Sequence, residues 1–391
     1  MNEVYITHAK RTAIGSFLGS LSDISAPFLG AEVIRNIISD SKIDPNALDE
    51  VILGQVITGG SGQNPARQTV IHSKLPEKLV ATTINKVCGS GLKAVCLAAN
   101  AIKAGEANMI LAGGQENMSL GLHGGYLRGG TKFGDIKLID FMMNDGLTDA
   151  FSNKLMGITA ENVAAKFNIS RLDQDNYALD SQLKSTRAQE QNIFKDEIIP
   201  VSVQRKKEAF IFDKDEGVRA NSTAEGLARL KPAFKEDGTV TAGNSSQIND
   251  GAACMLVASG EALKKYNLTP IVRIVSYASY GVDPSIMGTG PVPASKLALE
   301  KAGWKVGDLD LIEANEAFAA QSVYVNKEMG WDVSKVNVSG GAIALGHPIG
   351  ASGARVLITL LHGMKRLRAK KGLVTLCIGG GMGIAMCIEL C

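Results

Sequence analysis

The hydrophobic positions of this chain follow two periods that alternate along most of its length. Short apolar runs at residues 51–53 and 109–112 end near glycines, as buried strands do. Between them, Leu92, Val95, Ala99 and Ile102 recur on one face of a predicted helix. Further strand patterns cover 271–277, 309–312, 373–378 and 384–389, and further helical patterns cover 294–302 and 351–361. This alternation predicts an α/β fold.

The middle of the chain has a different pattern, with fewer clear strands between residues 119 and 244. It begins with a glycine-rich loop and continues with a helix whose start is marked by Ser170 and, three residues on, Asp173, the pattern of a capping box. A charged stretch follows at 195–219. We interpret 119–244 as an inserted loop domain, which leaves 1–118 with 245–269 as one half of the protein and 270–391 as the other.

One arrangement of glycines and apolar residues occurs twice. In both copies a glycine-rich turn opens a helix and is followed by an apolar strand that ends in glycines, at 88–114 and again at 350–380. The repeat indicates an internal duplication, and a chance likeness between two α/β units is the competing explanation.

Composition narrows the possible partners and compartments. The 391 residues are 45% hydrophobic and 20% charged, with a net charge of +2, which indicates no nucleic-acid or other polyanionic partner. The longest continuous apolar stretch, at 252–258, is shorter than the roughly 18 residues of a membrane helix. None of the six cysteines forms a Cys-x-x-Cys pair or a zinc pattern, so we expect no metal site and a reducing, cytoplasmic location.

Cys88 is the first candidate for chemistry. It stands immediately before the predicted helix at 92–102 and is followed by Gly89, Ser90 and Gly91. The positive end of a helix dipole lowers the pKa of a thiol and favours the thiolate, which is the nucleophilic form. The pattern is equally compatible with a buried structural cysteine.

His347 lies between Gly346 and Pro348 in the most glycine-dense stretch of the chain, at 340–353. A histidine in such a frame has a fixed backbone and open access, so it could accept a proton from a thiol or donate to an oxyanion. The alternative is a loop histidine with no role.

Two further residues follow predicted strands. Cys377 ends the strand at 373–378, just before three glycines, which is where α/β folds place functional groups. Asn315 follows the strand at 309–312, where its amide could hold a water or an oxyanion. The alternatives are a core cysteine for Cys377 and a helix cap for Asn315.

Together these stretches resemble the thiolase family, and specifically its short-chain biosynthetic branch. The likeness covers nearly the whole chain. It is carried by three sequence blocks that follow one another in the order typical of the family. The stretch Asn337-Val338-Ser339-Gly340-Gly341-Ala342 precedes the second block and belongs with it. The blocks are Asn85-Lys86-Val87-Cys88-Gly89-Ser90-Gly91, Gly346-His347-Pro348-Ile349-Gly350-Ala351-Ser352-Gly353 and Cys377-Ile378-Gly379-Gly380-Gly381-Met382-Gly383.

The resemblance implies a role for each candidate. Cys88 would take an acyl group as a thioester, His347 would activate it, and Cys377 would move the α-proton of the second acetyl-CoA. Asn315 would hold a water that forms one oxyanion hole with His347. The backbone N–H groups of Cys88 and Gly379 would form the other.

The same resemblance implies the substrate, the fold and the assembly. Coenzyme A would bind as a substrate, with no permanently bound cofactor. The fold would be two α/β halves in a five-layer αβαβα arrangement, and residues 126–132 resemble a tetramerisation loop, which implies a homotetramer. The expected coenzyme A and acyl contacts are Leu147, Met156, Arg219, Ala242, Ser246, Ile248, Met287, Ala317 and Phe318.

Three residues depart from the family pattern. Leu155 stands where histidine is frequent, Gln247 replaces a small residue beside Ser246, and Gln115 stands where methionine is common. The first two bear on coenzyme A affinity and on acyl-chain length.

Three functions remain open from the sequence. The first is the reversible Claisen condensation of two acetyl-CoA molecules to acetoacetyl-CoA and coenzyme A. The second is cleavage of longer 3-ketoacyl-CoA substrates in fatty-acid metabolism. The third is a catalytically silent protein that binds coenzyme A or lipid on the same fold.

Overall fold

The centre of the computed structural model, which describes residues 3–130, 132–205 and 208–391, is a large mixed sheet. Its strands follow the order β13-β14-β15-β12-β1-β11-β5-β3-β4, and the short strands β2 (Gly15–Ser16) and β8 (Ile198–Ile199) pair with β11 and β1. The first half supplies β1 (Val4–Thr12), β3 (Glu50–Gly54), β4 (Val80–Ile84), β5 (Met109–Asn117) and β11 (Asn249–Ser259). The second half supplies β12 (Val272–Gly281), β13 (Leu311–Ala314), β14 (Lys371–Ile378) and β15 (Met382–Leu390).

The strand order confirms the internal duplication. β3-β5-β11-β1 in the first half corresponds to β13-β14-β15-β12 in the second, and each pair of neighbours has the same parallel or antiparallel sense in both. Within the sheet, the halves join where Tyr5 and Ile6 of β1 pair with Arg273 and Val272 of β12. Chance similarity of two α/β units does not account for this correspondence.

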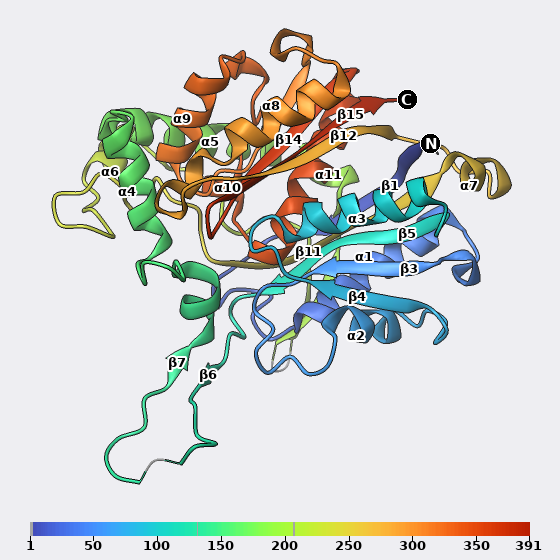
Figure 1. The fold of residues 1–391 in the computed structure, drawn as a ribbon, viewed down its shortest axis with the longest axis horizontal. Helices are drawn as coiled ribbons and strands as arrows, with labels where there is room; N and C mark the ends of the chain where they lie inside the picture. The colour runs from blue at the N-terminus through green and yellow to red at the C-terminus, as the bar shows by residue number, and fades with distance from the viewer. Residues whose placement is uncertain (1–2, 131, 206–207) are drawn as a thin grey trace.

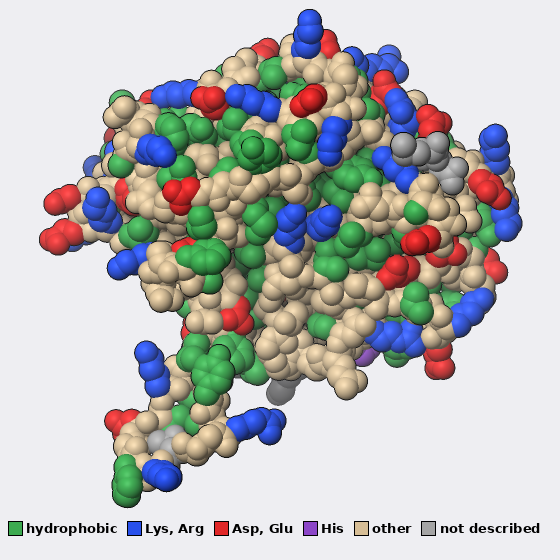
Figure 2. All heavy atoms as spheres, viewed as in Figure 1, with side chains coloured by type: hydrophobic (Ala, Val, Ile, Leu, Met, Phe, Trp, Pro, Cys, Tyr) green, Lys and Arg blue, Asp and Glu red, His purple; other side chains and the backbone are tan. Residues whose placement is uncertain are grey.

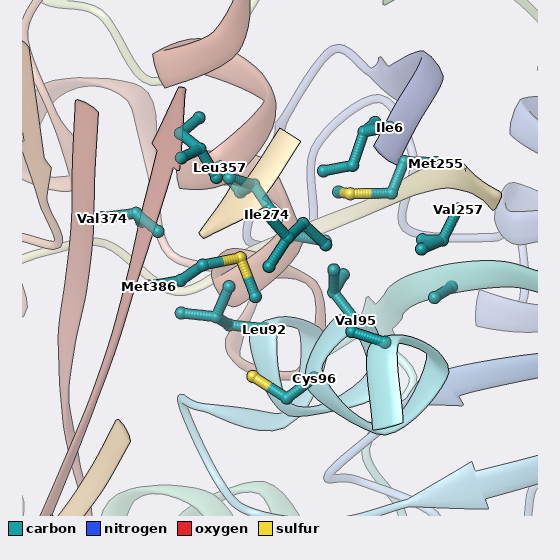
Figure 3. Packing of buried hydrophobic residues seen from close by; sticks show 14 of the residues in the cluster. Ile6, Leu92, Val95, Cys96, Met255, Val257, Ile274, Leu357, Val374 and Met386 are labelled. Carbon is teal, nitrogen blue, oxygen red and sulfur yellow. The ribbon is translucent and has the colours of Figure 1, made fainter. Parts of the chain in front are cut away.

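Five layers result, as the sequence predicts. The helices α3 (Ser90–Ala104) and α11 (Ile349–Leu367) share one apolar cluster with strands of both halves, so they form the middle layer (Figures 1 and 3). A second cluster packs α1 (Ala26–Ser41) and α2 (Pro65–His72) on the outer face of the first half. A third packs α8 (Pro291–Ala302) and α9 (Ala319–Met329) on the outer face of the second.

The two middle helices cross at glycines that occupy matching places in the two copies. A Cβ on Gly91 would lie 2.6 Å from the backbone nitrogen of Ala354, and a Cβ on Gly353 would lie 2.4 Å from that of Leu92. Both positions therefore exclude larger residues.

The stretch Val87–Ala104, which contains α3, is the one described segment long and apolar enough to cross a membrane by length and composition. A buried core helix passes the same test, and α3 is such a helix, enclosed between the two sheet halves.

Most predicted elements are present, with shifted ends. The helix expected at 351–361 extends over Ile349–Leu367, and the strand expected at 309–312 begins two residues later, at Leu311. Leu309 instead follows a short 3-10 turn at Val306–Asp308, as its C-terminal cap.

The middle segment contains α4 (Met156–Lys166), α5 (Arg171–Glu190) and α6 (Ala224–Ala228), and the predicted capping box of Ser170 and Asp173 starts α5. Its charged stretch holds a hairpin, β9 (Val201–Arg205) with β10 (Glu208–Phe212), that the pattern did not indicate. A second hairpin, β6 (His123–Gly124) with β7 (Ile139–Asp140), projects far from the body (Figure 1). The boundaries at 118/119, 244/245 and 269/270 stay predictions.

Candidate active site

Cys88 lies in a tight turn just before α3. Val87 has φ of 46°, a conformation that β-branched residues rarely adopt, and the turn is held by Ser90. The Ser90 hydroxyl accepts a hydrogen bond from the Lys86 N–H and donates to the Val87 carbonyl, each at 2.7 Å. The thiol of Cys88 is thereby aimed from a rigid, strained loop.

His347 enters from the loop that precedes α11. Gly346 has φ of 110°, and a Cβ there would meet the side chain of Asn249, which itself accepts a hydrogen bond from the His347 N–H at 2.8 Å. The imidazole Nδ1 lies 2.5 Å from Ser352 Oγ, and Nε2 lies 3.4 Å from Asn315 Nδ2. The ring is therefore fixed on both sides, and it is buried, in contrast to the open access expected from the sequence.

Asn315 extends β13 rather than capping a helix. Its N–H donates to the Thr375 carbonyl at 2.9 Å, and the next helix, α9, begins only at Ala319, so the capping alternative is wrong. The side chain is fully buried, and its Oδ1 has no hydrogen-bond partner among the described residues. An orphaned acceptor of this kind is a place for a bound water.

Cys377 and Gly379 come from the end of β14. Cys377 is fully buried and packs with Met156, Met287 and Phe318. The N–H of Gly379, two residues on, lies near the sulfur of Cys88, and together with the N–H of Cys88 itself it favours the thiolate form. The second half of the protein therefore contributes groups directly around a thiol of the first half.

A cavity of about 550 Å³ opens onto these groups. Cys88, His347 and Gly379 line it, while Cys377 and Asn315 are not among its lining residues. All nine residues expected to contact coenzyme A or the acyl group line it as well: Leu147, Met156, Arg219, Ala242, Ser246, Ile248, Met287, Ala317 and Phe318.

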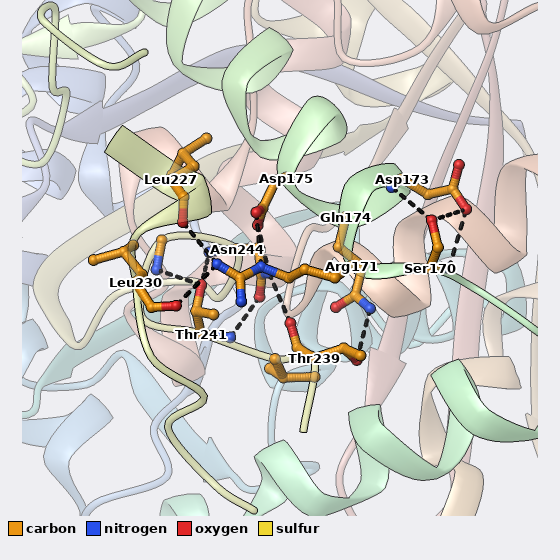
Figure 4. Close-up of polar contacts among 12 residues, drawn as sticks. Ser170, Arg171, Asp173, Gln174, Asp175, Leu227, Leu230, Thr239, Thr241 and Asn244 are labelled. Atoms are coloured by element: carbon orange, nitrogen blue, oxygen red, sulfur yellow. Dashed lines mark hydrogen bonds and ion pairs between the residues drawn. The ribbon is translucent and has the colours of Figure 1, made fainter. Parts of the chain in front are cut away.

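A polar network holds one wall of the cavity, residues 241–246, in place (Figure 4). Asn244 donates to Asp175 on α5 at 2.9 Å, and its own Oδ1 accepts from the Thr241 N–H at 2.8 Å. Arg171, in turn, bonds Asp175 at 2.7 Å and reaches the carbonyls of Leu227 and Leu230. Ala242 and Ser246 therefore sit on a loop with a fixed shape.

Comparison with known proteins agrees with this geometry. Residues 4–261 match the thiolase N-terminal domain and residues 268–390 match the thiolase C-terminal domain. The chain belongs to the thiolase family.

Its relatives cover the full length of this thiolase. It is 55% identical to the acetyl-CoA acetyltransferase of Paracoccus denitrificans, with 100% of both chains covered, and 58% identical to that of Chromobacterium violaceum, with 99% of both covered. Among solved structures, the Bacillus anthracis acetyl-CoA acetyltransferase is 41% identical with a TM-score of 0.98. The human mitochondrial 3-ketoacyl-CoA thiolase is 43% identical with a TM-score of 0.97, and each match covers 100% of this chain and 99% of the other.

Burial decides the protonation of the thiolase cysteines. It raises the pKa of Cys88 to about 11, and the N–H groups of Gly379 and Cys88 offset only part of the effect. The expectation that the helix dipole would lower this pKa is therefore wrong, because desolvation is the larger contribution. Burial, with the nearby Cys88, also raises the pKa of Cys377 well above its ordinary value.

Burial acts on His347 in the opposite sense, since its charged form is the protonated one. Together with the positive charge of Arg355, it lowers the pKa of His347 to about 3. Burial therefore disfavours both the Cys88 thiolate and the His347 imidazolium, which favours the neutral thiol and the neutral imidazole in the resting site.

The structure adds residues that the sequence did not single out. Phe234 lines the cavity and meets Phe318 edge-on, with centroids 6.1 Å apart. Glu116 is fully buried and accepts from the N–H groups of Val56, Ile57 and Gly350, which ties the loop after β3 to the start of α11. Such links join residues far apart in the sequence, so no local pattern marks them.

The structure also shows where the three residues that depart from the family pattern lie. Leu155 and Gln247 line the cavity, and Gln247 Nε2 donates to the carbonyls of Gly217, Ile343 and Ala344. Gln247 therefore fastens the loop that carries Arg219 to the turn that precedes His347. Gln115 is buried, where it accepts from Thr69 and donates to Gln55.

Proposed function

We propose that this thiolase is an acetyl-CoA acetyltransferase, which condenses two acetyl-CoA molecules to acetoacetyl-CoA and coenzyme A through an acetyl-cysteine intermediate. The observation that carries the proposal is the meeting of Cys88, His347 and the Gly379 N–H in one cavity, with Cys377 buried beside it. The printed names of the full-length relatives point to the same activity.

In the first step the acetyl group moves to Cys88. The Cys88 proton passes to His347 while the sulfur attacks the thioester carbonyl, and the N–H groups of Cys88 and Gly379 stabilise the negative oxygen. The coenzyme A sulfur then leaves and takes the proton from His347. Acetyl-Cys88 and free coenzyme A result.

In the second step Cys377, after releasing its own thiol proton to water, takes an α-proton from another acetyl-CoA. The enolate oxygen is stabilised by His347 and by a water that the orphaned amide oxygen of Asn315 would hold. The enolate carbon attacks acetyl-Cys88, a carbon–carbon bond forms, and the Cys88 sulfur leaves with the proton that Cys377 had taken. The product is acetoacetyl-CoA.

The cavity fits the long, mostly apolar arm of coenzyme A. Its wall from Met156, Ala317 and Phe318 would pack along the pantetheine, and Leu147 and Met287 would limit the acyl group. Arg219 is the one charged residue, among the described residues of the lining, that could meet the phosphates.

Two cysteine variants test the proposal. With radiolabelled acetyl-CoA, Cys88→Ala should take up no label, whereas Cys377→Ala should still become acetylated but should form acetoacetyl-CoA at least about 10²-fold more slowly. Peptide mapping should place the label of the wild-type protein on Cys88. Normal condensation by Cys377→Ala would remove Cys377 from the mechanism.

Cys96→Ala is the matched control, because Cys96 is another buried free cysteine, on α3 and outside the cavity lining. It should acetylate and condense as the wild-type protein does. Equal losses in all three variants would indicate a general folding defect instead of two catalytic roles.

A second activity is favoured by one comparison. The human mitochondrial 3-ketoacyl-CoA thiolase, named for ketoacyl substrates in general, shares nearly the whole backbone. Comparing the turnover of acetoacetyl-CoA with that of a 3-ketoacyl-CoA of eight or more carbons decides between the short-chain and the broader activity. We expect the short substrate to be preferred, and equal rates would favour a broader thiolase of fatty-acid metabolism.

The two free thiols of the mechanism, Cys88 and Cys377, also bear on the cellular compartment in which the enzyme works. Because both must stay reduced, we place it in the cytoplasm. We further propose a homotetramer, in which the projecting hairpin joins one pair of subunits to another.

A further inference from the structure

Two neighbouring strands of the first half, β5 and β11, each supply one hydrogen-bond acceptor to the loop that carries His347. Asn249, at the start of β11, accepts from the His347 N–H at 2.8 Å. Glu116, near the end of β5, accepts from the Gly350 N–H at 2.8 Å. The two side chains therefore hold the segment 347–350 at both of its ends.

The carboxylate of Glu116 has two further partners, which lie on the side of Cys88. Its Oε2 accepts from the Val56 N–H at 3.0 Å as well as from Gly350, and its Oε1 accepts from the Ile57 N–H at 3.1 Å. Val56 and Ile57 pack in the same apolar cluster as Cys88. An ionised carboxylate suits this place, because both of its oxygens accept and neither carries a hydrogen. One buried side chain thus bonds the surroundings of the thiol and the loop of the imidazole.

The start of α11 fits against the first half with no room to shift. A Cβ on Gly114 would lie 2.0 Å from the Gly350 carbonyl oxygen, and a Cβ on Gly54 would lie 2.9 Å from it. A Cβ on Gly350 itself would lie 2.8 Å from Glu116 Oε2. Because the backbones are in contact at these glycines, the bond to Glu116 fixes where the first turn of α11 lies, and with it His347, three residues earlier.

We propose that Glu116 is a positioning residue that fixes the backbone of the His347 loop relative to the turn of Cys88. The inference rests on the proposed function for its catalytic meaning. Glu116 is not among the residues that line the cavity, so it acts through His347 and not through a contact with substrate. It gives the second half a fixed place against the first at the point where their catalytic groups meet.

Single-turnover acetylation of Cys88 at pH 8 tests the inference. Burial raises the pKa of Glu116 to about 7, so the carboxyl group is mostly ionised at this pH. Glu116→Ala should acetylate about 10- to 100-fold more slowly, with KM for acetyl-CoA within about twofold of the wild-type value, because a displaced base slows the reaction and leaves the coenzyme A contacts in place. A wild-type rate in Glu116→Ala overturns the inference.

Glu116→Gln is the conservative variant. Its amide oxygen can still accept from the Gly350 N–H, so it should acetylate only about 3- to 10-fold more slowly than the wild-type protein. If circular dichroism shows that Glu116→Ala does not fold, Glu116→Gln takes its place in every measurement, and a wild-type rate in Glu116→Gln then overturns the inference.

A double variant separates positioning from a general loss of structure. If Glu116 acts through His347, Glu116→Ala should slow acetylation by no more than about twofold in the His347→Gln background, because the base that it positions is already absent there. Equal losses of rate in the wild-type and His347→Gln backgrounds would show that Glu116 does not act through His347, and they would overturn the inference.

Glu161→Ala is the matched control. Glu161, on α4, is also a buried carboxylate that accepts from backbone N–H groups, those of Thr239 and Val240. Its removal should lower the free energy of unfolding to a similar extent, yet keep the maximal acetylation rate within about twofold of the wild-type rate. An equal loss of rate in Glu161→Ala would assign the effect of Glu116→Ala to stability alone, against the inference.

Backbone hydrogen exchange gives a readout that does not depend on activity. In Glu116→Ala the Gly350 N–H loses its acceptor, so peptides that cover residues 346–352 should exchange at least about 10-fold faster by mass spectrometry, whereas Glu161→Ala should leave them unchanged. Unchanged exchange in Glu116→Ala overturns the inference. If exchange changes as expected but the wild-type protein never acetylates, the proposed function fails while the positioning of the loop by Glu116 stands.

Discussion

At the scale of single residues, the protonated resting state of Cys88 has a measurable consequence. Only a thiolate reacts with iodoacetamide, and burial raises the pKa of this thiol to about 11. In the free enzyme, the alkylation rate of Cys88 should therefore keep rising with pH beyond 9. A mass-spectrometric time course on the Cys88 peptide measures it.

His347→Gln is the comparison for this experiment. Because burial lowers the pKa of His347 and favours its neutral form, its removal should change the alkylation rate at pH 7 by less than about twofold. A rate that levels off near pH 7 in the wild-type protein, and loses that plateau in His347→Gln, would instead show a resting ion pair.

The residues that the structure brings together at the cavity could be predicted, whereas those that orient them could not. Cys88, His347 and Cys377 each stand beside glycines in the sequence, and that local pattern made them visible. The unusual φ of Val87, the three N–H bonds to Glu116 and the contact of Ser352 with the imidazole leave no such mark. They depend on packing between distant segments, which the order of residues does not reveal.

At the scale of elements, the loop 241–246 depends on one asparagine. Asn244 is fully buried and bonds both Asp175 Oδ1 and the Thr241 N–H, so Asn244→Ala leaves that oxygen and that N–H without these bonds. We expect a loss of about 1–3 kcal/mol in the free energy of unfolding. KM for acetyl-CoA should rise as well, because Ala242 and Ser246 line the cavity.

Urea unfolding and steady-state kinetics measure the two effects of Asn244→Ala. Asn162→Ala provides the control, since its amide donates to the Ser285 carbonyl at an exposed site on α4, outside the cavity lining. It should change the free energy of unfolding by about 0.5 kcal/mol or less. An unchanged KM in Asn244→Ala would mean that the loop keeps its shape without the network.

Elements were predictable where the hydrophobic period was strong and long. The buried middle helix α3 and the strand β14 were found from their patterns, because almost every apolar position in them faces the core. The hairpin of β9 and β10 was missed for the opposite reason. Its exposed face carries Ser202, Gln204 and Ile211, so polarity does not separate it from a charged loop.

At the scale of the whole molecule, the duplication explains why the site exists only when both halves are joined. Cys88 opens a helix of the first half, whereas His347, Cys377 and Gly379 all come from the second. The cavity lies where the two meet and is covered by the middle segment, which supplies Leu147, Met156 and Arg219. Catalytic competence therefore requires docking of the halves, although each half contributes a matching set of strands to the common sheet.

The projecting hairpin presents large aromatic side chains to solvent in the single chain. Tyr126 is 91% exposed and Phe133 is 95% exposed, at the end of a segment that leaves the body (Figure 2). Large exposed aromatic side chains on such an extension mark a contact with another molecule. Within this loop, Thr131 lies outside the described residues.

We therefore expect the double variant Tyr126→Asp, Phe133→Asp to change the assembly. Two buried charges per subunit would oppose association of hairpins, so native mass spectrometry should show dimers in place of the wild-type tetramer. Leu172→Asp, a charge placed on an exposed leucine of α5, should leave the tetramer intact. The cavity is built within one chain, so dimers of the double variant should still acetylate Cys88. A variant that stays tetrameric, or a wild-type protein that is never tetrameric, would remove the hairpin from the interface.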